Sequence, residues 1–124
     1  MKGFREELML AYRGHCAICG ASIPALLEAA HVVPWSDASD DERMSIANGL
    51  LLCRNHHALF DRGILVIGQD YTVTCTSDLL SVKQDGYEEA TRYDASKLRV
   101  PEDSCHRPDP ELIVRGNQLR AARS

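Results

Sequence analysis

The sequence has no long apolar run, no apolar stretch near its start and no surplus of basic residues. A helix needs about 20 consecutive apolar residues to cross a bilayer, so we expect no membrane segment. The opening Met1-Lys2-Gly3-Phe4-Arg5-Glu6-Glu7 lacks the apolar core of a secretion signal, and the five cysteines are an odd number. We therefore expect a cytoplasmic protein with reduced thiols.

Basic residues are in deficit, with 14 Lys and Arg against 18 Asp and Glu and a net charge of -4. A dedicated DNA-binding protein is usually basic, because Lys and Arg neutralise the phosphates. Part of the acidic surplus lies in one segment, which contains Asp37, Asp40, Asp41 and Glu42. We expect this segment to be a solvated loop in which Ser39 caps a short helical turn.

The chain of 124 residues, 44% of them hydrophobic, fits one α+β domain with a small core. Residues 4–13 have the apolar spacing of an amphipathic helix. We expect two strands at 26–33 and 49–52, with the acidic loop between them, and a helix at 54–61. These elements form a core at about 15–63.

A C-terminal extension at about 64–124 follows this core. Residues 64–67 and 71–76 are rich in β-formers around Gly68-Gln69-Asp70, which predicts a hairpin with Cys75 in the core. Residues 81–92 are polar and loop-like, 98–100 are a candidate short strand, and Pro108-Asp109-Pro110 announces a helix from about Glu111. Cys105-His106 has no second ligand pair nearby and is interpreted as a surface feature.

Two short ligand pairs predict a structural zinc site. Cys16 and Cys19 form a two-residue-spaced pair, and Cys53 and His56 form another, so together they supply four N/S ligands and leave no open position. The alternatives are buried structural cysteines, since free Cys is often a core residue, or a redox CxxC. The pairing of CxxC with CxxH favours zinc, and no strand-to-helix pattern supports the redox alternative.

His57, next to His56, is free for a second metal. Neighbouring helical side chains point about 100° apart, so the two histidines serve different partners. Asp61 lies one helical turn after His57 on the same face, which suits a cation held between an imidazole and a carboxylate. Asp61 could equally cap the helix or pair with Arg62. His31 is expected at the end of the first strand, and Trp35 to pack over the hairpin.

These residues closely resemble the HNH endonucleases of the ββα-metal class, more narrowly the domain found in bacterial restriction-type endonucleases. The resemblance is dense over residues 4–63 and looser through 98–101 and 108–112. It rests on the motifs Phe4-Arg5, Ala11-Tyr12, Cys16-Ala17-x-Cys19-Gly20, Ala29-Ala30-His31-Val32-x-Pro34-Trp35, Asn48-Gly49-Leu50 and His57-x-Leu59-Phe60-Asp61-x-Gly63.

The resemblance implies a zinc-stabilised ββα-metal domain that hydrolyses DNA phosphodiester bonds and leaves 5′-phosphate and 3′-hydroxyl ends. By the same resemblance His31 is the general base, His57 binds the catalytic cation, and Asn48 holds the loop between the strands. Asp61 falls where some relatives place a further ligand. A sparse oxygen and imidazole shell suits Mg²⁺ or Mn²⁺, with Ni²⁺ or Zn²⁺ as substitutes in vitro.

The chain departs from some relatives at Ala30, where they carry a metal ligand immediately before the general base. Glu28 is the nearest upstream acid, but in a strand positions 28 and 31 point to opposite faces. We therefore interpret Glu28 as a surface or supporting residue rather than a ligand. Arg13, Arg54 and Arg62 are candidates for phosphate contacts, of which Arg54 and Arg62 lie nearest the motif.

The sequence thus predicts a metal-dependent DNA endonuclease, with targeting to modified DNA by a fused or separate recognition domain. A homodimer is a reasonable expectation, because cutting both strands takes two active sites or two visits. One alternative is a non-catalytic zinc-stabilised module that binds nucleic acid or protein. Another keeps the nuclease but makes it a phage-type or homing-type nicking enzyme, or a toxin.

Overall fold

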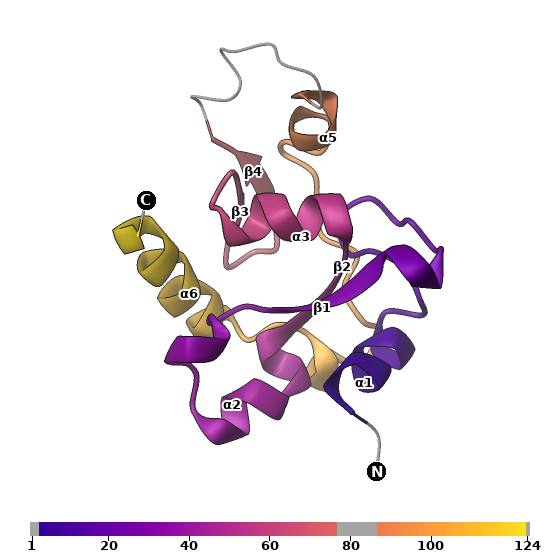
Figure 1. Cartoon of the computed structure of the whole chain (residues 1–124), viewed down its shortest axis with the longest axis vertical. Helices are drawn as coiled ribbons and strands as arrows, with labels where there is room; N and C mark the ends of the chain where they lie inside the picture. Colours follow the sequence, from indigo (N-terminus) through magenta and orange to yellow (C-terminus); the bar gives the residue numbers. More distant parts are fainter. Residues whose placement is uncertain (1–2, 77–86, 124) are drawn as a thin grey trace.

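A short antiparallel hairpin followed directly by a helix forms the centre of the molecule (Figure 1). The computed structural model describes residues 3–76 and 87–123. Strand β1 (Leu27–His31) pairs with β2 (Gly49–Cys53), in a register that places Leu27 opposite Cys53 and His31 opposite Gly49. Helix α3 (Arg54–Asp61) starts where β2 ends. This order is the predicted ββα arrangement.

The acidic segment lies in the long connection between β1 and β2. It contains helix α2 (Asp40–Met44), flanked by single 3-10 turns at Trp35–Asp37 and Ile46–Asn48. The side chain of Ser39 accepts a hydrogen bond from the backbone N–H of Glu42, and the Glu42 carboxylate accepts one from the N–H of Ser39. This reciprocal capping confirms the predicted helical turn.

The remaining elements surround this centre in Figure 1. Helix α1 (Phe4–Ala11) contacts both strands, and a 3-10 turn at Pro24–Leu26 leads into β1. The predicted hairpin is present as β3 (Leu65–Ile67) and β4 (Val73–Cys75). A 3-10 turn at Ser104–His106 precedes the last helix, α6 (Pro110–Arg123).

Two local predictions are wrong. Residues 87–91 form helix α5 (Tyr87–Thr91) rather than a loop, while the rest of the predicted loop before it, 81–86, lies outside the described residues. Its apolar period was hard to see because Ala90 is its only buried residue among 88–91. Residues 98–100 are not a strand. The N–H of Leu98 donates to Tyr71 and that of Arg99 to Ala17, so their hydrogen bonds go to two different segments.

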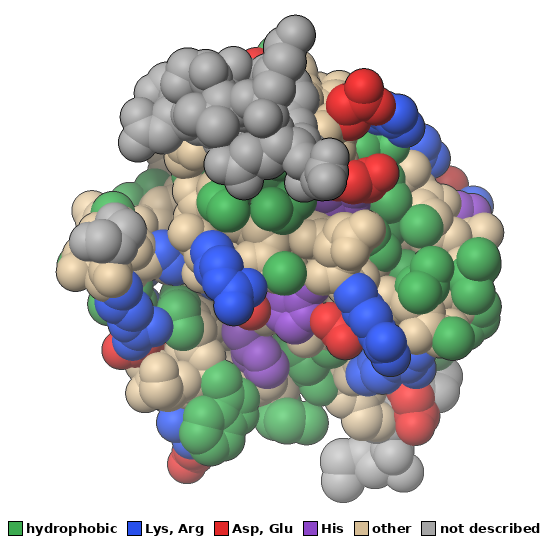
Figure 2. Space-filling model, turned by 45° about the horizontal axis from the view of Figure 1, so that its top comes forward, with side chains coloured by type: hydrophobic (Ala, Val, Ile, Leu, Met, Phe, Trp, Pro, Cys, Tyr) green, Lys and Arg blue, Asp and Glu red, His purple; other side chains and the backbone are tan. Residues whose placement is uncertain are grey.

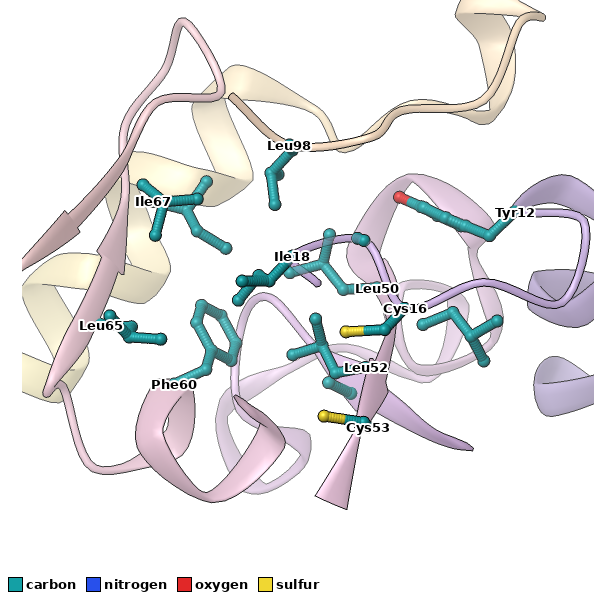
Figure 3. Close-up of a cluster of buried hydrophobic side chains, with 14 of the residues drawn as sticks. Tyr12, Cys16, Ile18, Leu50, Leu52, Cys53, Phe60, Leu65, Ile67 and Leu98 are labelled. Carbon is teal, nitrogen blue, oxygen red and sulfur yellow. The ribbon is translucent and has the colours of Figure 1, made fainter. Parts of the chain in front are cut away.

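The core is a continuous cluster of buried apolar side chains (Figure 3). Leu50 and Leu52 of β2 face Phe60 of α3, and Leu65 and Ile67 of β3 close the far side. All five residues of β2 are buried, because α1 and α3 both contact this strand. Cys75 is buried in the core, as predicted. None of the helices in the described ranges is long and apolar enough to span a bilayer.

Candidate active site and metal centre

The four predicted zinc ligands meet at one point beside the core. The ligand atoms of Cys16, Cys19, Cys53 and His56 all lie within 4.8 Å of one another. The sulfurs of Cys19 and Cys53 are 3.9 Å apart, close to the roughly 3.8 Å edge of a tetrahedron with Zn–S bonds of about 2.3 Å. The donor set therefore fits a closed zinc site.

The contacts within and around this cluster affect the protonation of its ligands. Nε2 of His56 donates to the carbonyl of Glu89 in α5 at 2.9 Å, which leaves Nδ1, 3.2 Å from the Cys53 sulfur, as the lone-pair nitrogen. The hydrogen bond with Cys53 and, against the opposing effect of burial, the one with His56 lower the pKa of the Cys16 thiol to about 3. The hydrogen bond with Cys16 and burial raise the pKa of Cys53, and burial raises the pKa of Cys19. A thiolate and a neutral imidazole are the forms that bind zinc.

His31 lies at the last position of β1, with its ring held on two sides. Nε2 donates to the carbonyl of Arg43 at 2.9 Å, and the ring of Phe4 stacks on it with centroids 4.5 Å apart and planes at 14°. Gly49 opposite His31 has no side chain, and an added Cβ would lie 2.7 Å from the Phe4 ring. The Asn48-Gly49 pair thus lets α1 approach closely enough to cover His31.

Asn48 is fully buried and bridges the connection between the strands. Its Oδ1 accepts from the N–H of Val33 at 2.8 Å, while its Nδ2 donates to the carbonyls of Val33 and Glu42 at 3.3 and 3.2 Å. One amide side chain thereby joins the end of β1 to helix α2. These contacts hold the segment whose Arg43 carbonyl accepts from His31.

His57 lies between two carboxylates. Its Nδ1 is 2.8 Å from Oε1 of Glu28, and its Nε2 is 3.1 Å from Oδ2 of Asp61. The hydrogen bond with Asp61 and, more weakly, the one with Glu28 raise the pKa of His57 against the opposing effect of burial. For Asp61, burial raises the pKa, but the hydrogen bond and charge of His57 outweigh it and lower the pKa overall.

The His57–Asp61 pair fits a hard divalent cation. Adjacent ligands on an octahedral ion with bonds of about 2.1 Å lie roughly 3.0 Å apart, which matches the 3.1 Å between Nε2 and Oδ2. Glu28 holds the opposite ring nitrogen, in the carboxylate–histidine arrangement that orients metal-binding imidazoles. Glu28, which was interpreted from the sequence as a surface or supporting residue rather than a ligand, contacts His57 through its carboxylate.

His31, His57 and Asp61 line one open pocket of about 580 Å³. Histidine side chains lie at the centre of this face, with Lys and Arg side chains on both sides (Figure 2). The other side chains that line the pocket are Ala29, Pro34, Trp35, Arg62, Arg120 and Arg123. The positive charge around the histidines suits an anionic substrate.

The predicted phosphate-contacting arginines differ in position. Arg62 is exposed and lines the pocket. Arg54 does not line this pocket, and its Nε is 3.5 Å from the carboxylate of Glu28. Arg13 pairs with Glu102 at 2.9 Å and lies against a different hollow. Of the three, Arg62 is the best placed to meet a phosphate.

Some residues of this pocket were placed wrongly or missed from the sequence. Trp35 was expected to pack over the hairpin, but it is 59% exposed at the pocket, with the Arg43 guanidinium 3.8 Å above its ring. Trp35 is the first residue of the 3-10 turn with which the chain leaves the hairpin. Arg120 and Arg123 of α6 also line the pocket, and no sequence spacing connects them to His31.

Comparisons with known proteins agree with this geometry. Residues 16–68 match the model of a family described as HNH endonuclease. The fold is similar to a solved structure titled "Modification dependent TagI restriction endonuclease", with a TM-score of 0.69 and 21% sequence identity. That match covers 94% of this chain but 36% of the other, so the chain spans about a third of its length. A comparison with curated proteins gave no match.

The matched segment contains both halves of the zinc cluster, the β1–β2 hairpin and α3. The fold is that of a small ββα domain, and its Cys/His cluster is suited to a structural zinc. Residues 16–68 form an HNH endonuclease domain, as the resemblance predicted.

Proposed function

We propose that this chain is a divalent-metal-dependent DNA endonuclease in which His31 is the general base and His57 a ligand of the catalytic cation. One observation carries this proposal. A strand and a helix bring His31 and His57 to the same open pocket. Nε2 of His31 is hydrogen-bonded to a backbone carbonyl, and His57 has a carboxylate at each ring nitrogen. Such a pair can supply the two functions that phosphodiester hydrolysis needs, a proton acceptor and a cation site.

The hydrogen bond of His31 defines which atom takes the proton. Because Nε2 donates its N–H to the Arg43 carbonyl, the neutral ring carries its lone pair on Nδ1. Nδ1 is therefore the atom that would accept a proton from an attacking water. Phe4 on one ring face and the Asn48 contacts of the loop limit the movement of the ring and its partner.

The cation would be held by His57 and Asp61, with the remaining positions left to waters and to phosphate oxygens. When bound, a divalent cation supplies charge neutralisation at the scissile phosphate and the leaving oxygen. Mg²⁺ or Mn²⁺ suits this donor set. Glu28 keeps the imidazole oriented, and Arg62 at the pocket adds positive charge for the substrate backbone.

We further propose a restriction-type role in which another module finds the target. The net charge of -4 is unfavourable for tight, independent binding to a duplex. The similar solved structure carries a title that describes modification dependence, and this chain matches about a third of it. Both observations support a division of labour, in which this domain cuts and a recognition domain selects modified DNA.

The test is plasmid cleavage with protein that retains zinc but lacks the second cation. A brief chelator wash followed by desalting should strip the weak site, and elemental analysis should still find one zinc per chain. Wild type is then assayed with Mg²⁺, Mn²⁺ or Ni²⁺ on modified and unmodified plasmid. We expect cation-dependent cutting by wild type, and the ratio of nicked to linear product will show whether both strands are cut together.

His31→Ala provides the decisive variant, with His106→Ala as a matched control. His106 pairs with Asp103 at 3.9 Å outside the pocket, so its loss should leave cleavage unchanged. His31→Ala should keep zinc and thermal stability but lose cleavage by at least about 100-fold, as expected for a general base. If zinc-loaded, folded wild type cuts neither plasmid with any cation, the domain is a binding module instead.

A further inference from the structure

The C-terminal helix α6, which lies outside the family match, packs directly on the main chain that follows His31. Gly116 of α6 faces Val32, and a Cβ added at Gly116 would lie 2.2 Å from the Val32 carbonyl oxygen. A glycine inside a helix is destabilising relative to alanine. Here its missing side chain lets the helix axis approach the backbone at the end of β1.

Arg120 lies one turn further along the same face of α6 and binds that backbone. Its two terminal nitrogens donate to the carbonyls of Val32 and His31, at 2.6 and 2.7 Å. The guanidinium lies 4.1 Å above the ring of Phe60 in α3, and the side chain is only 8% exposed. Arg120 therefore connects the strand of His31 to the helix of His57.

Two further arginines of α6 hold the acidic segment on the other side of His31. Arg115 pairs with Glu42 at 2.6 Å, and Arg123 pairs with Asp37. Glu42 precedes Arg43, whose carbonyl accepts from His31. Helix α6 is thus fixed both to the main chain of His31 and to the segment that holds its ring (Figure 1).

We propose that α6 is needed for the geometry of the active site, and that its Arg120 is a positioning residue that fixes the backbone of His31. This proposal rests on the function proposed above. Bidentate donation by a planar guanidinium fixes both the distance and the direction of two consecutive carbonyls. A displacement of about 1 Å in a catalytic group can lower a rate by about 100-fold. Loss of Arg120 should therefore slow the chemical step rather than weaken DNA binding.

Steady-state cleavage by Arg120→Ala tests this assignment, with zinc content and thermal melting as controls for folding. We expect kcat to fall about 10- to 100-fold while KM changes less than about 3-fold. Addition of a small guanidinium compound should restore part of kcat, and Arg120→Lys should retain more activity than Arg120→Ala. Arg92→Ala removes the same charge from an exposed ion pair between Arg92, just after α5, and Glu88, and should have no effect.

A nitrogen-15 NMR spectrum of the His31 imidazole provides a readout that needs no cleavage. In wild type, we expect a single tautomer with the proton on Nε2, because this nitrogen donates to Arg43. In Arg120→Ala, the two tautomers should exchange. If wild type never cuts DNA but the single-tautomer signature is lost in Arg120→Ala, the proposed function fails while the positioning of His31 by Arg120 stands.

Three results would overturn the proposal. These are an unchanged kcat in folded Arg120→Ala, a rise in KM with kcat intact, and a His31 spectrum identical to wild type. If Arg120→Ala does not fold, the same measurements are made on Arg120→Lys. The lysine keeps the positive charge, so this variant should fold, but an ammonium holds the two carbonyls less rigidly than a guanidinium. We therefore expect kcat to fall severalfold with KM unchanged, and a wild-type kcat would reject the role.

Discussion

Helix α3 contributes to two proposed metal sites that differ in burial and in the number of protein ligands, although their histidines are neighbours in sequence. His56 points into a buried cluster in which four ligand atoms converge within 4.8 Å. His57 points into an open pocket, with one carboxylate on each ring nitrogen. The first site is complete without solvent or substrate, whereas the second leaves most positions of a cation free.

This difference suggests separate roles, with the closed site stabilising the fold and the open site available for catalysis. A closed site with four protein ligands has no position for a substrate, so its metal can only hold segments together. It joins the chain before β1, the end of β2 and the start of α3. The open site leaves room for water and phosphate oxygens, and we expect a cation there to contribute little to folding. Substitutions at the two sites should therefore fail in different ways.

The largest effect should follow from breaking the closed site. Cys53→Ser removes one of four ligands, and because binding of a structural zinc is coupled to folding, the variant should lose zinc and unfold. Structural zinc contributes on the order of 10 kcal/mol, which is comparable to the whole stability of a small domain. Elemental analysis and circular dichroism melting measure both consequences.

Cys105→Ser is the matched control for this prediction. Cys105 is exposed and does not belong to the cluster, so the same exchange should leave zinc and melting unchanged. A Cys53→Ser variant that melts like wild type would show that the zinc site does not hold the fold.

Adjacent histidines provide the sharpest comparison of the two sites. His56→Ala should lose zinc and unfold, whereas His57→Ala should keep one zinc and its fold but lose cleavage by at least about 100-fold. Zinc content, melting and plasmid cleavage are measured side by side. Equal loss of zinc in both variants would contradict the division of α3 into two faces.

A smaller effect should follow from weakening the support of the open site. Glu28→Gln keeps the shape of the side chain that holds Nδ1 of His57 but removes its charge. Loss of such a partner weakens metal affinity by about 10- to 100-fold. Cleavage should thus need more Mn²⁺ for half-maximal rate and recover at saturation.

Glu89 offers a control of the same type. It supports His56 through its backbone carbonyl, so Glu89→Gln should leave both metals unaffected. If Glu28→Gln cleaves with the Mn²⁺ dependence of wild type, the contact between Glu28 and His57 plays no part in metal binding.

The closed site could be predicted from the sequence because its signal is local. Its four ligands occur as two pairs with two-residue spacing, so a few neighbouring positions are enough to recognise the zinc site. The open site depends on contacts that no spacing reveals. Glu28 reaches His57 only because α3 folds back over β1, and Arg120 reaches the His31 carbonyl from the far end of the chain.

Some of these long-range contacts did leave a trace in the sequence. Gly116 interrupts a helix at a cost in stability, and such a glycine indicates close packing against a backbone. Nothing comparable marks Trp35, whose exposure depends on the direction in which a 3-10 turn leaves the hairpin. Short elements such as α5 were missed because they bury too few side chains to show a period.

The smallest expected effect concerns substrate contact at the rim of the open site. Arg62 is exposed at the pocket, whereas Arg13 is paired with Glu102 outside it. Measured in a His31→Ala background, where DNA stays uncut, Arg62→Ala should weaken DNA binding severalfold and reduce the salt dependence by about one phosphate contact. Arg13→Ala removes the same charge and should change neither quantity. If the two variants weaken binding equally, DNA senses only the net charge, and the pocket that contains His31 and His57 is not where the backbone lies.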